Sequence, residues 1–332
     1  MLHRVYSLTH VAWRTEPKRL GMIYCYQRPC ELRYSTYTPV STPDTSKAIT
    51  MKPVTLTKSL SLARSGRISP DGSSVVFIGR EDPLESHNGC FELYSTQLPS
   101  HDMVSTPTKI LSLVDSPIGD LPPDIPTNDL NDLVGSLISS VFPGVFADQL
   151  PKQCFSLDGS KVYFNTQWGV CLAAVCVDLK TGQVQRLTKL TSIISPIGIE
   201  DSTASTSILD ISGDYMVFST SSPLVPARVG LLSLSSGQLW CTTKAPKFYS
   251  LASKYQFKEL NKGPEKRLAD GTADDGDNAY ENMNILDKLA SMRYKVITSM
   301  EKGIPFQSIL ILPPPGASGD KLPMVVSPHG GK

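Results

Sequence analysis

One short unit occurs three times along this chain, and this repetition limits the possible folds more than any other feature. The copies read ISPDGSSVVFIG (68–79), FSLDGSKVYFNT (155–166) and DISGDYMVFST (210–220). Each copy places a small polar turn directly before an apolar strand that carries a phenylalanine. An Asp-Gly or Gly-Asp turn supplies the positive φ angles that close a tight hairpin, so each copy predicts paired antiparallel strands.

A second matching stretch follows two of the copies. VCVDLKTGQVQRLT follows the second copy and LLSLSSGQLW the third, so that Gly182 lies 23 residues after Gly159 and Gly237 lies 24 after Gly213. Each unit of about 45 to 55 residues therefore predicts a short antiparallel meander, as in a blade of a β-propeller. A single four-stranded sheet cannot bury both faces, so it must stack on its neighbours. A β-sandwich would also contain short strands, but it would not require this internal repeat.

The spacing of the copies indicates an insertion near residues 115–145. Asp71 and Asp158 are 87 residues apart, far more than one unit, and the proline-rich stretch DSPIGDLPPDIPTND (115–129) lies between them. After it, apolar residues recur at helical spacing behind a cap at Thr127 or Asn128. We expect a short amphipathic helix that either packs on a sheet or binds a partner. Its apolar residues are Leu130, Leu133, Val134, Leu137, Ile138 and Val141.

A second change of pattern predicts a domain boundary near residue 292. The stretch 261–282 is polar, and its acidic residues do not have the spacing of a calcium-binding loop, so we expect a solvated loop over 270–281. Those residues are Asp274, Asp275, Asp277 and Glu281. Three apolar stretches follow: YKVITSM, FQSILILPPP and LPMVVSPHGG. We therefore predict a partial β-propeller over residues 1–292 and the first strands of a different, α/β domain over 293–332.

Charge and composition argue against several classes of function. The 332 residues carry a net charge of +1, so no overall field favours nucleic acid or an anionic membrane. No run of about 18 apolar residues is present, as a membrane-spanning helix would need. Seven cysteines are an odd number for a disulfide framework and suit a reducing compartment, so we expect a cytoplasmic protein.

No metal site or cofactor is indicated by the sequence. Cys25 and Cys30, like Cys171 and Cys176, are five residues apart, which on a strand places the two thiols on opposite faces. His87 and Cys90 form only half of a zinc site, because zinc requires four ligands. Buried thiols are the simpler interpretation.

The final residues suggest a catalytic loop. Strand, turn, strand, turn, strand and then His-Gly-Gly is the opening of an α/β-hydrolase domain, in which the loop after the third strand donates a backbone N–H to the oxyanion hole. Glycine suits that loop because, without a Cβ, its main chain can approach the substrate oxygen closely. Gly330 and Gly331 are the candidate oxyanion-hole residues.

A propeller followed by a hydrolase domain resembles the prolyl oligopeptidase family of serine peptidases, and within it the acylaminoacyl peptidases. The residues that carry the resemblance are VAWRTEPKRLGMIYC (11–25), SPDGSSVVF (69–77), CFSLDGSKVYF (154–164) and above all LPMVVSPHGG (322–331). The resemblance implies an enzyme that releases N-acylated, commonly N-acetylated, amino acids from short blocked peptides, which are its expected partners. It also implies that Gly331 is the oxyanion donor and His329 shapes the loop, and it leaves a homo-oligomer open.

The sequence departs from the family pattern in ways that limit the expected activity. No Gly-x-Ser-x-Gly motif occurs, His329 is the only histidine after His101, and Lys332 stands where the family continues with proline. We therefore expect a fragment that lacks the catalytic serine, aspartate and histidine and is inactive alone. Only about four blades are recognisable, whereas the family's propeller has seven. A propeller scaffold that binds proteins without catalysis, and a dipeptidyl or prolyl oligopeptidase, are the alternatives.

Overall fold

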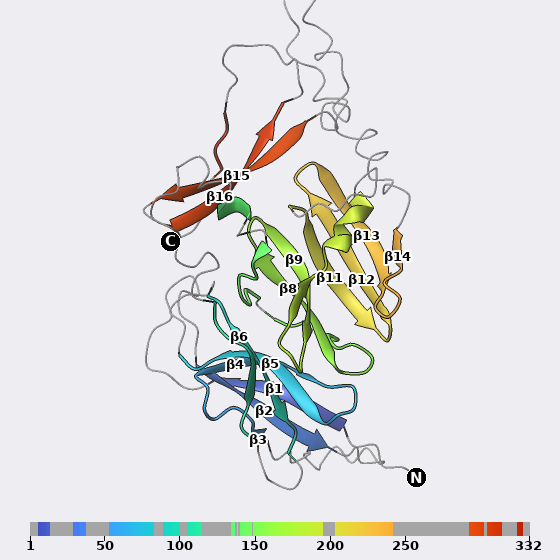
Figure 1. Ribbon diagram of the computed structural model, residues 1–332. Coiled ribbons are helices and arrows are strands. Elements are labelled where there is room, and N and C mark those ends of the chain that lie inside the picture. Colours follow the sequence, from blue (N-terminus) through green and yellow to red (C-terminus); the bar gives the residue numbers. More distant parts are fainter. Residues whose placement is uncertain are drawn as a thin grey trace, which may run out of the picture. The chain divides into compact units, whose positions relative to one another are not determined.

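The computed structural model describes residues 6–13, 29–37, 53–82, 89–99, 105–114, 134–136, 138, 140–147, 149–194, 203–241, 292–301, 304–313 and 324–327. This part of the chain is mainly β, and antiparallel pairing dominates each sheet, as the sequence predicts (Figure 1). The chain divides into two compact units: residues 1–242 with 298–308, and residues 243–297 with 309–332. The repeated sequence lies in the first unit.

The first sheet contains seven strands, six of them in the order β1-β2-β4-β5-β6-β7, with β3 paired to β2. β4 to β7 form the antiparallel meander expected around the first repeat, and β4 and β5 continue past a bulge between Arg64 and Arg67. β2 joins this meander through a single parallel pair, Cys30 with Leu62. The strands are β1 (Tyr6–Trp13), β2 (Cys30–Tyr37), β3 (Val54–Thr55), β4 (Leu62–Ile68), β5 (Ser74–Arg80), β6 (Glu92–Gln97) and β7 (Thr108–Leu111).

The second and third sheets are built from the second and third repeats. The second sheet has the order β10-β9-β8 and the third has the order β11-β12-β13-β14, so each is an uninterrupted antiparallel meander. The strands are β8 (Lys161–Trp168), β9 (Cys171–Asp178), β10 (Val184–Arg186), β11 (Ser205–Ser212), β12 (Tyr215–Ser222), β13 (Val225–Ser233) and β14 (Leu239–Cys241). A 3-10 helix, η1 (Thr188–Ile194), follows β10. The four-stranded meander predicted for one unit is confirmed in the third sheet.

The predicted hairpin glycines all have left-handed backbone angles. The φ angles are 72° at Gly72, 71° at Gly159, 57° at Gly213, 72° at Gly182 and 66° at Gly237. A Cβ makes this region unfavourable for most residues, which explains why glycine recurs at these turns.

Serine hydroxyls complete the first two repeated turns in the same way. Ser69 and Ser73 donate hydroxyl hydrogen bonds of 2.6 and 2.7 Å to the Asp71 carboxylate. Ser156 and Ser160 do the same for Asp158, at 2.6 and 2.8 Å. These bonds favour the ionised carboxylate and lower the pKa of Asp71 and of Asp158 to about 2.

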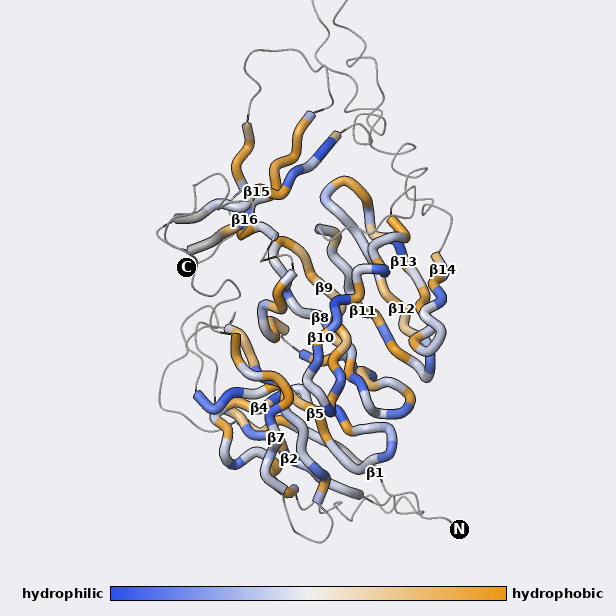
Figure 2. Tube along the Cα trace, viewed as in Figure 1, coloured by the Kyte–Doolittle hydropathy of each residue, from blue (hydrophilic) through white to orange (hydrophobic). Residues whose placement is uncertain are grey.

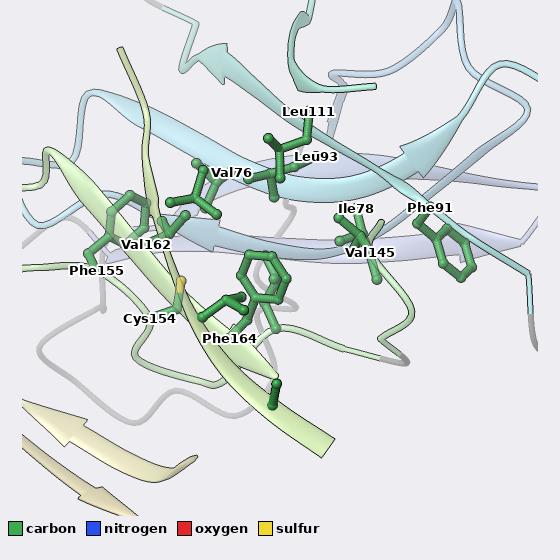
Figure 3. Packing of buried hydrophobic residues seen from close by; sticks show 14 of the residues in the cluster. Val76, Ile78, Phe91, Leu93, Leu111, Val145, Cys154, Phe155, Val162 and Phe164 are labelled. Atoms are coloured by element: carbon green, nitrogen blue, oxygen red, sulfur yellow. The ribbon is translucent and has the colours of Figure 1, made fainter. Parts of the chain in front are cut away.

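The repeated phenylalanines show how the three sheets stack. Phe164 lies in the apolar cluster shared by the first and second sheets, together with Val76, Ile78 and Val162, and Phe218 lies in the cluster shared by the second and third. Figure 3 shows Val76, Ile78 and Leu93 facing Phe155, Val162 and Phe164. In Figure 2 apolar residues, in orange, follow the strands. Phe164 and Phe218 thus pack against the preceding sheet in the same way, whereas the equivalent Phe77 packs in a third cluster within the first sheet region.

The predicted helix is only partly within the described residues. Val134, Gly135, Ser136, Ile138 and Ser140 are helical, and Val134 is fully buried. The proline-rich stretch 115–129 and the acidic stretch 270–281 lie outside the described residues. None of the helical segments in the described ranges has the length and apolar content needed to cross a lipid bilayer.

Two of the three predicted C-terminal strands are confirmed, and the third is not. β15 (Arg293–Glu301) and β16 (Ile304–Leu312) pair in a two-stranded sheet. The third predicted strand, in LPMVVSPHGG, is not formed in its described part: Met324, Val325 and Val326 are 76, 92 and 70% exposed, and residues 324–327 have no strand pairing. An apolar sequence forms a buried strand only where a neighbour covers it.

Candidate functional site

The sequence predicts an oxyanion loop at His329, Gly330 and Gly331, but these three residues lie outside the described residues. His87, considered above as a zinc ligand together with Cys90, also lies outside them. Cys171 and Cys176 are both buried on β9, but only Cys176 packs in the cluster between the second and third sheets; Cys171 contacts Trp168 and Arg186. Within the described ranges, no three His, Cys, Asp or Glu side chains gather where they could hold a metal ion.

Two cavities lie between β4, the segment that leads into β8, and β11. The smaller has a volume of about 440 Å³. It is lined by residues 66–68 and 152–157, by Thr9 and Pro70, and by Ile211 and Gly213 at the end of β11 and in the turn after it. The larger, of about 820 Å³, is lined by residues 149–152 and by Asn165, Ile208, Leu209 and Asp210. Arg67 and Lys152 line both cavities. These two cations are the centre of the candidate site.

The Arg67 guanidinium donates to two backbone carbonyls in the segment that leads into the second sheet and to one carbonyl of its own strand, β4. Its Nε donates to the Pro151 carbonyl at 2.5 Å, one terminal nitrogen donates to the Leu150 carbonyl, and the other to the Gly66 carbonyl at 3.0 Å. The Leu150 N–H in turn donates to the Ser65 hydroxyl at 2.7 Å. The guanidinium therefore joins the first and second sheets at fixed geometry.

The local backbone of β4 explains how Arg67 reaches this position. Ser65 has a φ of 60°, unusual for a residue with a Cβ, and it lies in the bulge between Arg64 and Arg67. A β-bulge bends its strand and redirects the following side chains. The bulge thus positions both the Ser65 hydroxyl and the Arg67 guanidinium for their bonds to Leu150.

The electrostatics leave Arg67 without a counter-ion among the described residues. Burial lowers the pKa of the half-buried Arg67, and the nearby thiol of Cys154 has its pKa raised by burial to about 12. Cys154 is therefore a neutral thiol at pH 7 and cannot balance the charge. Arg67 and Lys152 form no ion pair within 4.0 Å in the part of the chain that the structure describes.

Equivalent positions of the repeat meet at these cavities. Arg67, Cys154 and Asp210 each lie two residues before the turn serine of their repeat, Ser69, Ser156 or Ser212, and each lines one or both cavities. Sequence reasoning did not select these residues. An alignment of the three repeats could have found them. At this position the first repeat has a cation, the second a thiol and the third a carboxylate.

Comparison with known proteins identifies the family. Residues 3–243 match the family model of the N-terminal domain of acylamino-acid-releasing enzyme, which is most of the chain. The chain belongs to this family. The predicted resemblance to acylaminoacyl peptidases is therefore confirmed.

Individual relatives agree with the family match. The acylamino-acid-releasing enzyme of Arabidopsis thaliana is 28% identical over 82% of this chain and 34% of its own length. That of Mus musculus is 26% identical over 98% of this chain and 35% of its own length. The chain thus spans about a third of the length of these relatives.

Solved structures give a weaker similarity. A puromycin-hydrolyzing peptidase of Mycobacterium tuberculosis aligns with a TM-score of 0.37 and 14% identity over 71% of this chain and 26% of the peptidase. A similarity at this level does not define a shared fold.

Proposed function

We propose that this chain is the N-terminal part of a serine peptidase that releases N-acylated amino acids from short blocked peptides. The observation that carries the proposal is the family match over residues 3–243, because the curated relatives with this domain are named acylamino-acid-releasing enzymes. In this proposal the first, second and third sheets are blades of a β-propeller. The packing of neighbouring sheets against each other and the recurring glycine turns support that architecture.

The proposal assigns residues 293–332 to the beginning of an α/β-hydrolase domain. The hairpin of β15 and β16 exposes large apolar side chains that a larger sheet would cover, with Ile297, Phe306, Ile309 and Ile311 between 36 and 50% exposed. The His-Gly-Gly sequence that follows supports the same assignment.

In the proposed enzyme, the backbone N–H groups of Gly330 and Gly331 stabilise the oxyanion that forms when a serine attacks the acylated residue's carbonyl. Gly331 is the leading donor and His329 shapes the loop. One such donor typically contributes about 3–4 kcal/mol of transition-state stabilisation. The serine, the histidine that takes its proton and the aspartate that orients the histidine would come from outside these 332 residues, because no Gly-x-Ser-x-Gly motif is present. The proposed compartment is the cytoplasm.

Two experiments test this proposal. The purified 332-residue chain should show no labelling by a fluorophosphonate probe of active serines, and strong labelling would mean that it contains a nucleophile of its own. Transcripts sequenced beyond the codon of Lys332 should continue in frame to a Gly-x-Ser-x-Gly motif at the end of an apolar strand. A stop codon directly after Lys332 in every transcript would contradict the proposal and favour a scaffold.

A further inference from the structure

The smaller cavity carries an unbalanced positive charge. Of its described lining residues, only Arg67 and Lys152 are charged, whereas the larger cavity also has Asp210. The Asp210 carboxylate accepts a hydrogen bond from the Ile211 N–H at 2.9 Å and makes no ion pair within 4.0 Å among the described residues. The two cations of the smaller cavity thus have no carboxylate facing them in its described lining.

The acidic residues nearest in sequence have their carboxylates engaged elsewhere. Asp71 and Asp158 follow the lining residues Pro70 and Leu157, but both carboxylates accept hydrogen bonds from the serines of their own turns. Such bonds hold the carboxylates in the turns. They reduce the positive potential of the cavity at longer range without occupying it.

A half-buried cation without a counter-ion is costly unless an anion binds to it. Removing a charge from water is unfavourable, and backbone carbonyl dipoles compensate only in part. A guanidinium has five N–H donors, of which three serve the carbonyls of Pro151, Gly66 and Leu150. The other two N–H donors of Arg67 and the ammonium of Lys152 have no hydrogen-bond acceptor among the described residues, and they are suited to a carboxylate.

We propose that the smaller cavity binds the C-terminal carboxylate of a short peptide. This inference rests on the proposed function for its choice of ligand, because an N-acylated peptide has lost its positive amino terminus and keeps the negative carboxyl terminus. Such a substrate carries one net negative charge if its side chains are neutral. A volume of about 440 Å³ is near the lower end of ligand pockets, about 300–1,000 Å³, and fits the end of a peptide rather than a folded protein.

The site therefore recognises the end of the substrate opposite to the acylated residue. Its two cations attract blocked peptides with a free, negatively charged carboxyl terminus more strongly than peptides without net charge. They also raise the local concentration of these anionic peptides near the cavity. A peptide whose carboxyl terminus is amidated lacks the group that the site binds.

Binding is tested on the 332-residue chain by ligand-observed NMR titration with three peptides. N-acetyl-trialanine and unblocked trialanine carry the carboxylate, and N-acetyl-trialanine amide does not. The amide should bind about ten- to a hundredfold more weakly than N-acetyl-trialanine, as expected for lost hydrogen bonds to a charged group. Raising the salt from roughly 0.05 to 0.5 M should weaken the carboxylate peptides selectively. Equal binding of the acid and the amide would overturn the proposal.

Variants locate the site. Lys152→Gln should weaken N-acetyl-trialanine roughly two- to fivefold, the range for an exposed charge. Lys180→Gln is the matched control, because Lys180 is exposed at the turn between β9 and β10 and lines neither cavity. Arg67→Gln should abolish the preference for the acid peptide over the amide peptide. Because this substitution also removes the hydrogen bonds to the carbonyls of residues 150 and 151, Lys152→Gln is the decisive test of the site. Identical affinities for the Lys152 and Lys180 variants would refute the site.

The same titrations separate this site from the proposed function. If trialanine and N-acetyl-trialanine bind through Lys152 while the protein from the full coding sequence releases no acylated amino acid, the carboxylate site stands and the peptidase assignment fails. If acylated residues are released and binding shows no dependence on the carboxylate, the peptidase stands and the site fails.

Discussion

Replacing Asn165 by alanine removes a side chain that makes three hydrogen bonds, two of them to the third sheet. β11 is the edge strand of the third sheet, and the Asn165 amide takes the place of a neighbouring strand along its free edge. Its Nδ2 donates to the Thr206 carbonyl at 2.7 Å and to the Ala173 carbonyl at 3.3 Å, while its Oδ1 accepts from the Ile208 N–H at 2.8 Å.

The magnitude follows from the groups that the substitution leaves unpaired. Thr206 and Ile208 are only 2 and 8% exposed, so the carbonyl of one and the N–H of the other lose a partner in a buried setting. Each buried group left without a partner costs about 1–3 kcal/mol. Asn165 lines the larger cavity, from which water can reach the Thr206 carbonyl and the Ile208 N–H. We therefore expect Asn165→Ala to lower the free energy of unfolding by about 2–3 kcal/mol in total.

The assay is urea denaturation followed by tryptophan fluorescence, with Trp168 on the same strand as the reporter. With a urea m-value of about 2–3 kcal/mol/M, Asn165→Ala should lower the midpoint by about 1 M. Gln167→Ala is the matched control, because the Gln167 side chain is exposed on the same strand and donates a local hydrogen bond, to the Gly169 carbonyl at 2.9 Å, while its backbone bonds are kept. That control should stay within about 0.5 kcal/mol of the parent. If the two variants unfold at the same urea concentration, the stacking of the second and third sheets described above is wrong.

Two further predictions concern the core and the turns. Gly230→Ala should destabilise the chain by about 1–3 kcal/mol in the same assay, because the added Cβ would lie 2.4 Å from Cζ of the buried Phe218; an unchanged midpoint would show that the ring can move freely. The pKa of Asp71 and Asp158 is lowered to about 2 in the folded chain, below about 3.9 when unfolded, so their contribution to stability is complete above pH 4 and is lost as the pH falls toward 2. Denaturation followed by circular dichroism at each pH should therefore show that the free energy of unfolding falls less between pH 4 and 2 for the Asp71→Asn, Asp158→Asn double variant than for the parent chain. The same pH dependence in both proteins would contradict the assigned hydrogen bonds.

The repeated units could be predicted from the sequence because their determinants are local. A glycine at a turn and an apolar strand beside it act within a few residues, and the structure has both where the repeats place them. The attachment of β1 and β2 to the first sheet could not be predicted in the same way. It involves one parallel pair, Cys30 with Leu62, and a few hydrogen bonds such as that from the Thr9 hydroxyl to the Gly66 carbonyl, between distant segments with no shared motif.

The candidate site was harder to predict because it depends on how the sheets stack. Arg67 and Lys152 are ordinary basic residues in the sequence, and only the bulge at Ser65 and the packing of the first and second sheets bring them to one cavity. The apolar run Met324–Val326 illustrates the opposite case. Its composition favours a buried strand, but burial also requires a covering surface that composition does not specify.

The most direct test of whether this chain belongs to a longer serine peptidase begins with the native protein. That protein is captured from its source cells with an antibody raised against residues 203–241. The captured material is treated with a fluorophosphonate probe and assayed for release of N-acetylalanine from an N-acetylated peptide. We expect one labelled polypeptide, roughly three times as long as this chain by comparison with its relatives, that releases the acetylated residue. Capture of a 332-residue polypeptide alone, unlabelled and with no release of N-acetylalanine, would contradict it.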